Sequence, residues 1–262
     1  MIKSIKHLVQ PLHILESKLL SLVIGAWVIV IIGLWQLTAN GLIPTPLIVL
    51  NSLGRILTGK EFYDNLFASL ALSFKGMGIS LVIAVVVSYL SLIPLFRPLT
   101  NFVIKCRYLT ITGLIFLFTL LTQDGGQLKI SLLIFGIVPF FVTSLMSIID
   151  NINPQEYELC KTLRMNNWQS VLEVVIIGRI DQVIEVIRQN FAIAWGMITL
   201  VEGLSMSQGG IGTMIIKSNK YLDLGAVFAE LLIIFAIGLA FDYLLTKFRY
   251  WIFPYNKLLA GK

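Results

Sequence analysis

The sequence is poor in charge and in the residue types that carry most enzyme chemistry. Only 13% of its 262 residues are Asp, Glu, Lys or Arg, and 57% are apolar, whereas a soluble domain has about 25% charged residues. It contains two histidines and two cysteines, and no Cys/His spacing resembles that of a metal site. We therefore expect no bound metal, and the composition favours a membrane protein.

The sequence also lacks the short motifs of nucleotide and hydrolase sites. It has no phosphate-binding loop of the Gly-x-x-x-x-Gly-Lys-Ser/Thr type, and neither Gly-x-Ser-x-Gly nor His-Glu-x-x-His occurs. The net charge of +6 comes from basic residues spread over loop ends, without the aromatic-interleaved basic patch that indicates nucleic-acid binding. We expect no enzyme activity, no cofactor and no nucleic-acid partner for this chain.

Long uncharged runs are the main feature that is present. Charged residues are absent from residues 19–54, 76–96, 108–123 and 130–149. A helix needs about 20 largely apolar residues to cross a bilayer, so each run predicts a transmembrane helix. Two weaker spans, at about 184–204 and 224–245, contain a few charged residues. The sequence therefore predicts an all-α polytopic membrane protein with about six transmembrane helices.

The distribution of basic residues predicts which side each loop faces. With a cytoplasmic N-terminus, fourteen lysines and arginines fall in inside segments and five in outside segments, as the positive-inside rule requires. Both termini are then cytoplasmic, and so are Cys106 and Cys160, for which a disulfide is not expected. We predict one membrane domain over residues 1–262, with cytoplasmic segments at 1–18, 150–182 and 246–262.

The longest polar segment, residues 150–182, lies between two apolar spans and predicts the contact with a soluble partner. A helix here would place Leu159 and Leu163 on an apolar flank and Glu158 and Lys161 on a polar one. Such a helix, held just outside the bilayer, could press against another protein. An ordinary long cytoplasmic loop is the alternative interpretation of the same segment.

Several short motifs follow one another in an order that resembles a known family. They are Pro44-Thr45-Pro46, Glu158-Leu159-Cys160, Trp168-Gln169, Arg188, Ala194-Trp195, Glu202, Gly210-Ile211-Gly212 and Asp242. This pattern is similar to that of the integral-membrane permease subunit of type I ABC importers, in the branch that serves nitrate, sulfonate, taurine and bicarbonate. In that family, a Glu-Ala-Ala (EAA) loop occupies the place of Glu158-Leu159-Cys160, and the likeness extends from about Leu34 to Tyr250.

The resemblance implies a function, a set of partners and a location. It implies a permease in a bacterial inner membrane that forms the translocation path for a small, anionic solute. It also implies a second, identical permease subunit, two ABC ATPase subunits that hold ATP and Mg²⁺, an external solute-binding protein, and membrane lipids. The residues implied in coupling to the ATPase are Glu158, Leu159, Cys160, Thr162, Leu163, Arg164 and Trp168. Two alternatives are a non-transporting scaffold derived from the family and an unrelated membrane carrier or enzyme.

The sequence departs from the family pattern at three places. Arg164 stands where the family keeps a loop glycine, and the family's closing Ile-x-Leu-Pro becomes residues 174–177, Val-Val-Ile-Ile, without the proline. The proline-rich start of the third span is also missing at residues 107–111. Because glycine adopts positive φ without steric cost and Arg does not, either the loop turns differently or its two short helices run together.

A further set of residues is predicted to line the translocation path or a gate. Most of them have a structural alternative: Lys75 could reach the membrane surface rather than attract an anion, and Trp195 could pack rather than stack on solute. Gly210 and Gly212 could form only a turn. Glu202, two helical turns beyond Trp195, is expected to be hydrogen-bonded or ion-paired rather than lipid-facing. The set is Lys75, Arg188, Trp195, Glu202, Gly210 and Gly212.

Overall fold

The computed structural model describes residues 17–39 and 43–254, and within these ranges every regular element is a helix. The elements are α2 (Ser17–Thr38), α3 (Pro46–Thr58), α4 (Lys60–Leu90), α5 (Arg97–Lys105), η1 (Cys106–Tyr108), α6 (Ile111–Leu121), α7 (Gly125–Asp150), α8 (Pro154–Thr162), α9 (Asn167–Ser170), η2 (Val171–Ile176), η3 (Ile177–Arg179), α10 (Ile180–Leu204), α11 (Ile211–Lys220) and α12 (Leu224–Ile252). The predicted all-α class is confirmed. Residues 1–16 of the predicted N-terminal segment and 255–262 of the predicted tail lie outside the described residues.

Four helices, α2, α4, α7 and α12, are long and apolar enough to cross a membrane. Helix α10 has 25 residues but carries Asp181, Glu185, Arg188 and Glu202, and it is not among the helices that pass this test within the described residues. Its length and its central position nevertheless agree with the predicted fifth span, because Glu185, Arg188 and Glu202 find partners inside the protein, as described below.

The third predicted span, residues 108–123, is not one straight helix. The segment Arg97–Tyr108 meets α6 at an angle of 112°. Leu109 and Thr110 between them have extended backbone, with ψ of 129° and 132°, so the helical hydrogen bonds stop at this point. An apolar run fixes the environment of a segment but not its continuity, and this explains why the hydropathy pattern missed the break.

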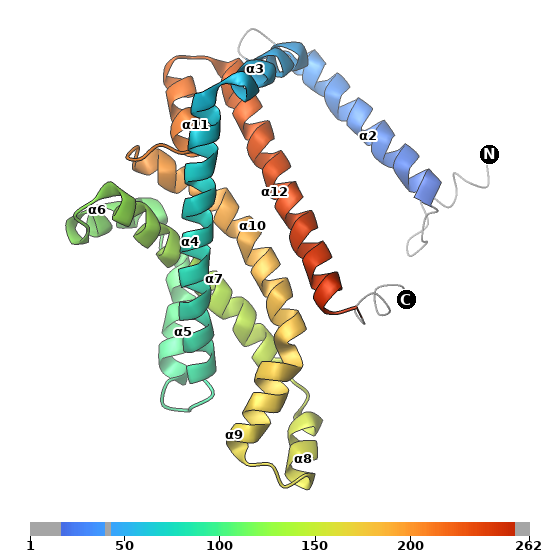
Figure 1. The fold of residues 1–262 in the computed structure, drawn as a ribbon, viewed down its shortest axis with the longest axis vertical. Coiled ribbons are helices and arrows are strands. Elements are labelled where there is room, and N and C mark those ends of the chain that lie inside the picture. Colours follow the sequence, from blue (N-terminus) through green and yellow to red (C-terminus); the bar gives the residue numbers. More distant parts are fainter. Residues whose placement is uncertain (1–16, 40–42, 255–262) are drawn as a thin grey trace.

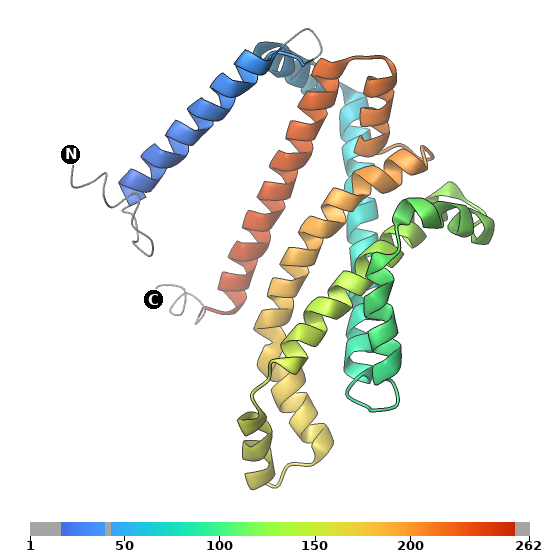
Figure 2. The ribbon, with the colours of Figure 1, turned by 180° about the vertical axis from the view of Figure 1, so that it is seen from behind.

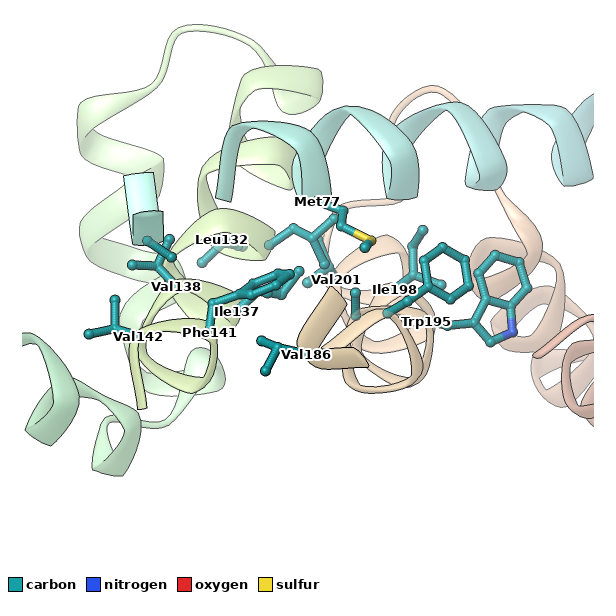
Figure 3. Packing of buried hydrophobic residues seen from close by; sticks show 14 of the residues in the cluster. Met77, Leu132, Ile137, Val138, Phe141, Val142, Val186, Trp195, Ile198 and Val201 are labelled. Carbon is teal, nitrogen blue, oxygen red and sulfur yellow. The ribbon is translucent and has the colours of Figure 1, made fainter. Parts of the chain in front are cut away.

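Helix α7 is the centre of the molecule, and it packs against α4 on one side and α10 on the other (Figure 1). The main core fills the space between these three helices, with Leu132, Ile137 and Phe141 of α7 fully buried (Figure 3). Helices α11 and α12 cover α10, and α3 packs on α12. The α3–α11 end and the α8–α9 end are therefore at opposite ends of the bundle (Figure 1).

Helix α4 approaches α7 closely because the face that it turns to the core is made of small residues. Gly76 shows the limit, since a Cβ there would lie 2.5 Å from Leu133 Cδ2. Small residues at helical spacing let two membrane helices pack backbone to backbone. The buried small residues of this face are Ser69, Ser73, Gly76, Ser80, Ala84 and Ser88.

Helix α2 stands apart from the rest of the bundle. Figure 2 shows it diverging from α12, which it approaches only near its C-terminal end. There, Trp35 stacks on Phe228 with ring centroids 6.1 Å apart and donates its Nε1–H to Pro44 O at 3.1 Å. None of the apolar stretch of α2 is buried, so most of the surface of α2 can meet lipid or another protein.

Candidate functional site at the two ends of the bundle

At the α3–α11 end, Glu202 is the centre of a buried hydrogen-bond network. Its carboxylate is only 1% exposed, and Oε1 accepts a hydrogen bond from Ser69 Oγ at 2.6 Å while Oε2 accepts one from Gly212 N at 2.9 Å. Ser69 also accepts from Ile211 N at 2.9 Å. The expected polar partners of Glu202 are therefore present, and they tie α10 to α4 and to the start of α11.

The loop between α10 and α11 is strained and anchored at several points. Three successive residues, Gln208, Gly209 and Gly210, have positive φ of 64°, 71° and 117°. Lys129 Nζ donates to Gly209 O at 2.8 Å, and Gly210 N donates to Asn65 Oδ1 at 2.7 Å. A non-glycine residue at positive φ costs about 1 kcal/mol or more, so these anchors hold a conformation that the loop alone would not favour.

Gly210 and Gly212 are required by the geometry of this network. A Cβ on Gly210 would lie 2.3 Å from the carboxyl carbon of Glu202, and one on Gly212 would lie 2.5 Å from Thr199 O. The glycines thus allow the loop to approach the carboxylate closely. This accounts for the predicted turn at both positions, and their role in a gate stays a prediction.

Toward the α8–α9 end, Arg188 joins α10 to α12 through an ion cluster. It pairs with Asp242 of α12 and, at 2.5 Å, with Glu185 one turn before it on α10. Arg249 of α12 pairs with Glu185 at 2.8 Å. The sequence indicated Arg188 and Asp242 but missed Glu185 and Arg249, although an acid three residues before an arginine inside an apolar helix is a usable signal.

Trp195 lies between these two polar regions and is packed inside the protein. It is buried, its Nε1–H donates to Ile234 O of α12 at 2.9 Å, and its ring stacks with Phe191 at a centroid distance of 6.4 Å. These contacts favour the packing interpretation over solute stacking. Lys75, the remaining predicted path residue, lies halfway along α4 and lines a cavity next to Glu202.

The helix expected within residues 150–182 is not continuous over Glu158–Trp168. Helix α8 ends at Thr162 and α9 begins at Asn167, and the turn between them places Arg164 at φ 57°. Met165 N donates to Cys160 O and Arg164 N to Lys161 O, both at 3.0 Å. These two bonds form the helix-ending motif in which glycine is the preferred residue at positive φ. Arg164 therefore keeps the family's turn with a less favourable residue.

The second short helix runs on into α10 rather than ending. Helix α9 continues through the π-helical segment η2 and the 3-10 segment η3, in the region where the family's proline is missing. Without proline, the backbone N–H groups remain available for helical hydrogen bonds, and the irregular turns absorb the change of direction. Neither expectation for this loop holds, because α8 and α9 stay separate and the positive-φ turn is present at Arg164. Only the exit from α9 toward α10 is continuous.

A small second core fixes the helix–turn–helix of residues 154–170, called here the coupling hairpin, to the bundle. Cys160 is buried against Val174 and Val175, and Tyr89 at the end of α4 packs against this cluster. Arg179 pairs with Glu156 at 2.5 Å. Burial and the charge of Glu156 raise the pKa of Tyr157, while Arg179 partly opposes them. The hairpin is therefore a rigid extension of α4 and α10.

The tip of the coupling hairpin exposes large apolar side chains. Leu159, Leu163 and Trp168 are 61%, 62% and 66% exposed. Glu158, Thr162 and Arg164 are exposed beside them, and of the predicted coupling residues only Cys160 is buried. The buried Cys160 thus belongs to the second core, and the other members of the set are available to a partner.

The chain is similar in sequence and fold to proteins of one transport family. Residues 19–251 match the family described as the binding-protein-dependent transport system inner membrane component. The chain belongs to this family. It is also 23% identical over 220 residues, 80% of this chain and 78% of the other, to SsuC of Bacillus subtilis (strain 168), which is named as an aliphatic sulfonates transport permease protein.

A solved structure supports the same fold for this permease. A chain from the crystal structure of an amino acid ABC transporter with histidines superposes with a TM-score of 0.62 at 16% identity, over 76% of the permease and 96% of that chain. The permease is thus a multi-pass membrane protein of the ABC importer type, and its family serves transport rather than catalysis. Within its described residues, no group of three or more His, Cys, Asp or Glu is placed to hold a metal ion.

Proposed function

We propose that this permease imports a small anionic solute across a bacterial inner membrane with energy from ATP hydrolysed by two separate ATPase subunits. ATP and Mg²⁺ belong to those subunits, because the permease sequence has no phosphate-binding loop. Two observations support an anionic solute. One is the sulfonate in the name of the Bacillus subtilis relative, and the other is a lysine, Lys75, halfway along α4.

The exposed apolar tip of the coupling hairpin carries this proposal. Leu159, Leu163 and Trp168 are more than half exposed on a hairpin that its own small core holds rigid. Exposed apolar side chains on a rigid support are typical of a docking surface. We assign the hairpin to the cytoplasm, where it sits in a cleft of an ATPase subunit, and both termini then lie on the same side.

Rigid attachment explains how the hairpin transmits movement. The second core joins it to Tyr89 of α4, and the pair Glu156–Arg179 joins α8 to the segment that leads into α10. When the ATPase subunits approach each other, α4 and α10 move with the hairpin as one body, in the manner of a rigid-body transition. At the other end, α10 is tied through Glu202 to the α11 loop, so the movement reaches the side on which the solute-binding protein docks.

A second, identical permease subunit completes the pathway in this proposal. Helix α2 has no buried apolar stretch of its own, and Figure 2 shows it held away from α12. Because α2 stands apart from the bundle, a wide apolar surface stays uncovered. We assign this surface to membrane lipids and to the second subunit.

The test is co-purification of the permease with a co-expressed ABC ATPase subunit, in mild detergent. Trp168→Ala should reduce the amount of bound ATPase at least tenfold, because a central aromatic anchor contributes about 2 kcal/mol or more to an interface. Trp27→Ala is the matched control, since Trp27 is 64% exposed but lies in α2, far from the hairpin. Equal loss of ATPase in both variants, or in neither, would contradict the docking surface.

Uptake of sulfonate, nitrate or bicarbonate into proteoliposomes that contain the complete complex tests transport. ATP-dependent uptake of one of these anions supports the importer, whereas an intact complex that transports none of them would favour a non-transporting scaffold.

A further inference from the structure

A cavity of about 260 Å³ lies between α4, the first turns of α7, and the strained loop after α10. Its wall includes Lys75, Lys129, Glu202, Gln208, Gly126 and Gly209. This volume is just below the range of about 300–1,000 Å³ that is usual for ligand pockets, so the cavity suits a solute of a few heavy atoms. Charged residues are rare inside transmembrane segments, yet this cavity contains two lysines.

The cavity carries more positive charge than its single carboxylate neutralises. Both oxygens of Glu202 already accept hydrogen bonds, from Ser69 and Gly212. Lys129, which is 3% exposed, donates to Gly209 O, and a lysine ammonium has three N–H donors. Two donors of Lys129 thus remain, and even if Glu202 balances the charge of Lys129, that of Lys75 is left over.

Lys75 is exposed, and it has no hydrogen-bond or ion-pair partner among residues 17–39 and 43–254. It lies fifteen residues into the 31-residue helix α4, about 22 Å along its axis, and its neighbour Phe74 packs on Phe191 and Phe241 of the bundle. Intramembrane lysines usually face a cavity and a counter-ion. The cavity supplies the first, and a bound anion would supply the second.

The loop that closes the cavity also presents donors to it. Gln208 adopts φ 64°, and its side-chain amide lies so close to Gly126 that a Cβ there would be 2.6 Å from the amide atoms. Asp124, the residue before α7, makes no side-chain capping bond, so the N–H groups of the first turn, which includes Gly126, lack that partner. Strain of this kind at a cavity wall is typical of a binding site.

We infer that this cavity is an oxyanion subsite in which Lys75 and Lys129 bind a small sulfonate-like group, with the Gln208 amide as a further donor. The identity of the ligand rests on the proposed function, whereas the charge of the site does not. Because Lys129 anchors the loop between α10 and α11 and Gln208 is part of that loop, an anion in the cavity contacts the segment that Glu202 ties to the rest of the bundle.

Calorimetric titration of the full-length permease with methanesulfonate tests this inference. Dodecyl maltoside is the detergent of choice because it is uncharged and contains no phosphate, so the detergent itself does not compete for the site. Lys75→Gln should weaken binding at least tenfold, and Lys75→Arg should retain it within about threefold, since both Lys and Arg are cationic. Lys220→Gln is the matched control, because Lys220 is an exposed lysine in the last turn of α11 and is not part of the cavity wall.

Chemical rescue gives a second readout, because binding that is restored by modification cannot have been lost through misfolding. Lys75→Cys should lose methanesulfonate binding, modification with methanethiosulfonate ethylammonium should restore it, and a neutral methyl reagent should not. The wild-type permease treated in the same way controls for Cys106 and Cys160.

Each outcome decides the inference separately from the proposed function. Equal binding by wild type and Lys75→Gln, or no binding by wild type, would overturn the subsite, even if an ATPase co-purifies with the permease. Binding that depends on Lys75 without an associated ATPase would leave the subsite in place and overturn the importer function.

Discussion

The two ends of the helix bundle differ in which kind of side chain they bury and which they expose. At the α3–α11 end, the polar groups around Glu202 are buried and hydrogen-bonded within the chain. At the α8–α9 end, the apolar side chains of the coupling hairpin are exposed to solvent. Satisfied polar groups stabilise a conformation, whereas exposed apolar groups gain free energy only when another surface covers them. The hydrogen bonds around Glu202 are therefore made within one chain, whereas the exposed apolar side chains of the hairpin are covered only by a partner.

The largest expected effect is at Glu202. Replacing it with Leu leaves the buried donors of Ser69 and Gly212 without an acceptor, and each such donor costs about 1–3 kcal/mol. We expect Glu202→Leu to destabilise the permease by about 3 kcal/mol, and Glu202→Gln, which keeps one acceptor oxygen, by about 1 kcal/mol. Thermal unfolding in detergent measures both. A Leu variant as stable as the wild type would show that this end does not depend on the carboxylate.

The coupling hairpin should respond in the opposite sense, with little change in stability and a large change in assembly. Leu163→Ser alters an exposed side chain, so the free energy of unfolding should change by less than about 0.5 kcal/mol. ATPase binding should weaken about tenfold, which corresponds to about 1.4 kcal/mol. Leu222→Ser, in an exposed position beside α11, is the control at the other end. A loss of stability in Leu163→Ser equal to its loss of binding would remove the contrast between the two ends.

The fold could be predicted from the sequence where the physical signal is local and strong. Uncharged runs predicted α2, α4 and α7 because crossing a bilayer requires continuous apolar length. The break at Leu109 and Thr110 could not be predicted, because apolar residues are compatible with both a straight and a bent path. Helix α10 was an uncertain span for a related reason, since hydropathy counts its charges but not the partners, on α4 and α12, that satisfy them.

The candidate site could be predicted only in part. Motif spacing led to Glu202 and Arg188, whereas Asn65, Ser69 and Lys129 carry no signal in the sequence, because their role depends on the packing of α4 and α7 beside the α11 loop. At the coupling hairpin, the family likeness indicated the turn. The sequence did not show that Arg164 would adopt the backbone conformation of the glycine that it replaces.

Substitutions in the turn at Arg164 should change stability less than Glu202→Leu does, and glycine at this position should raise stability rather than lower it. Arg164 has φ 57°, a conformation that costs a non-glycine residue about 1–2 kcal/mol, and glycine recovers this energy but gains freedom in the unfolded chain. We expect Arg164→Gly to stabilise the permease by about 1 kcal/mol and Arg164→Val to destabilise it, both measured by thermal unfolding. Unchanged ATPase binding in the glycine variant would show that only the turn matters, whereas lost binding that Arg164→Lys retains would indicate an ion pair with the partner.

The smallest expected effect is a pH dependence at the α3–α11 end. Asp223 caps α12 by accepting a hydrogen bond from Ala226 N at 3.0 Å and pairs with Arg55 at 2.5 Å. These two contacts, the backbone hydrogen bond first, lower the pKa of Asp223 despite some burial. Because its folded pKa lies below the ordinary value of about 3.9, the stabilisation is complete above that value and is lost as the pH falls through the lowered pKa.

The size of this effect is limited because both side chains of the pair are substantially exposed, so solvent screens the ion pair to less than about 1 kcal/mol. Asp223→Asn keeps a capping oxygen but cannot titrate, so the wild type should lose more stability than this variant between pH 7 and about pH 3. Unfolding temperatures across this range measure the difference, with Asp64→Asn, an exposed aspartate of α4, as the control. If the unfolding temperatures of wild type and Asp223→Asn fall in parallel as the pH is lowered, the hydrogen bonds of this end, rather than its surface charge, account for its stability.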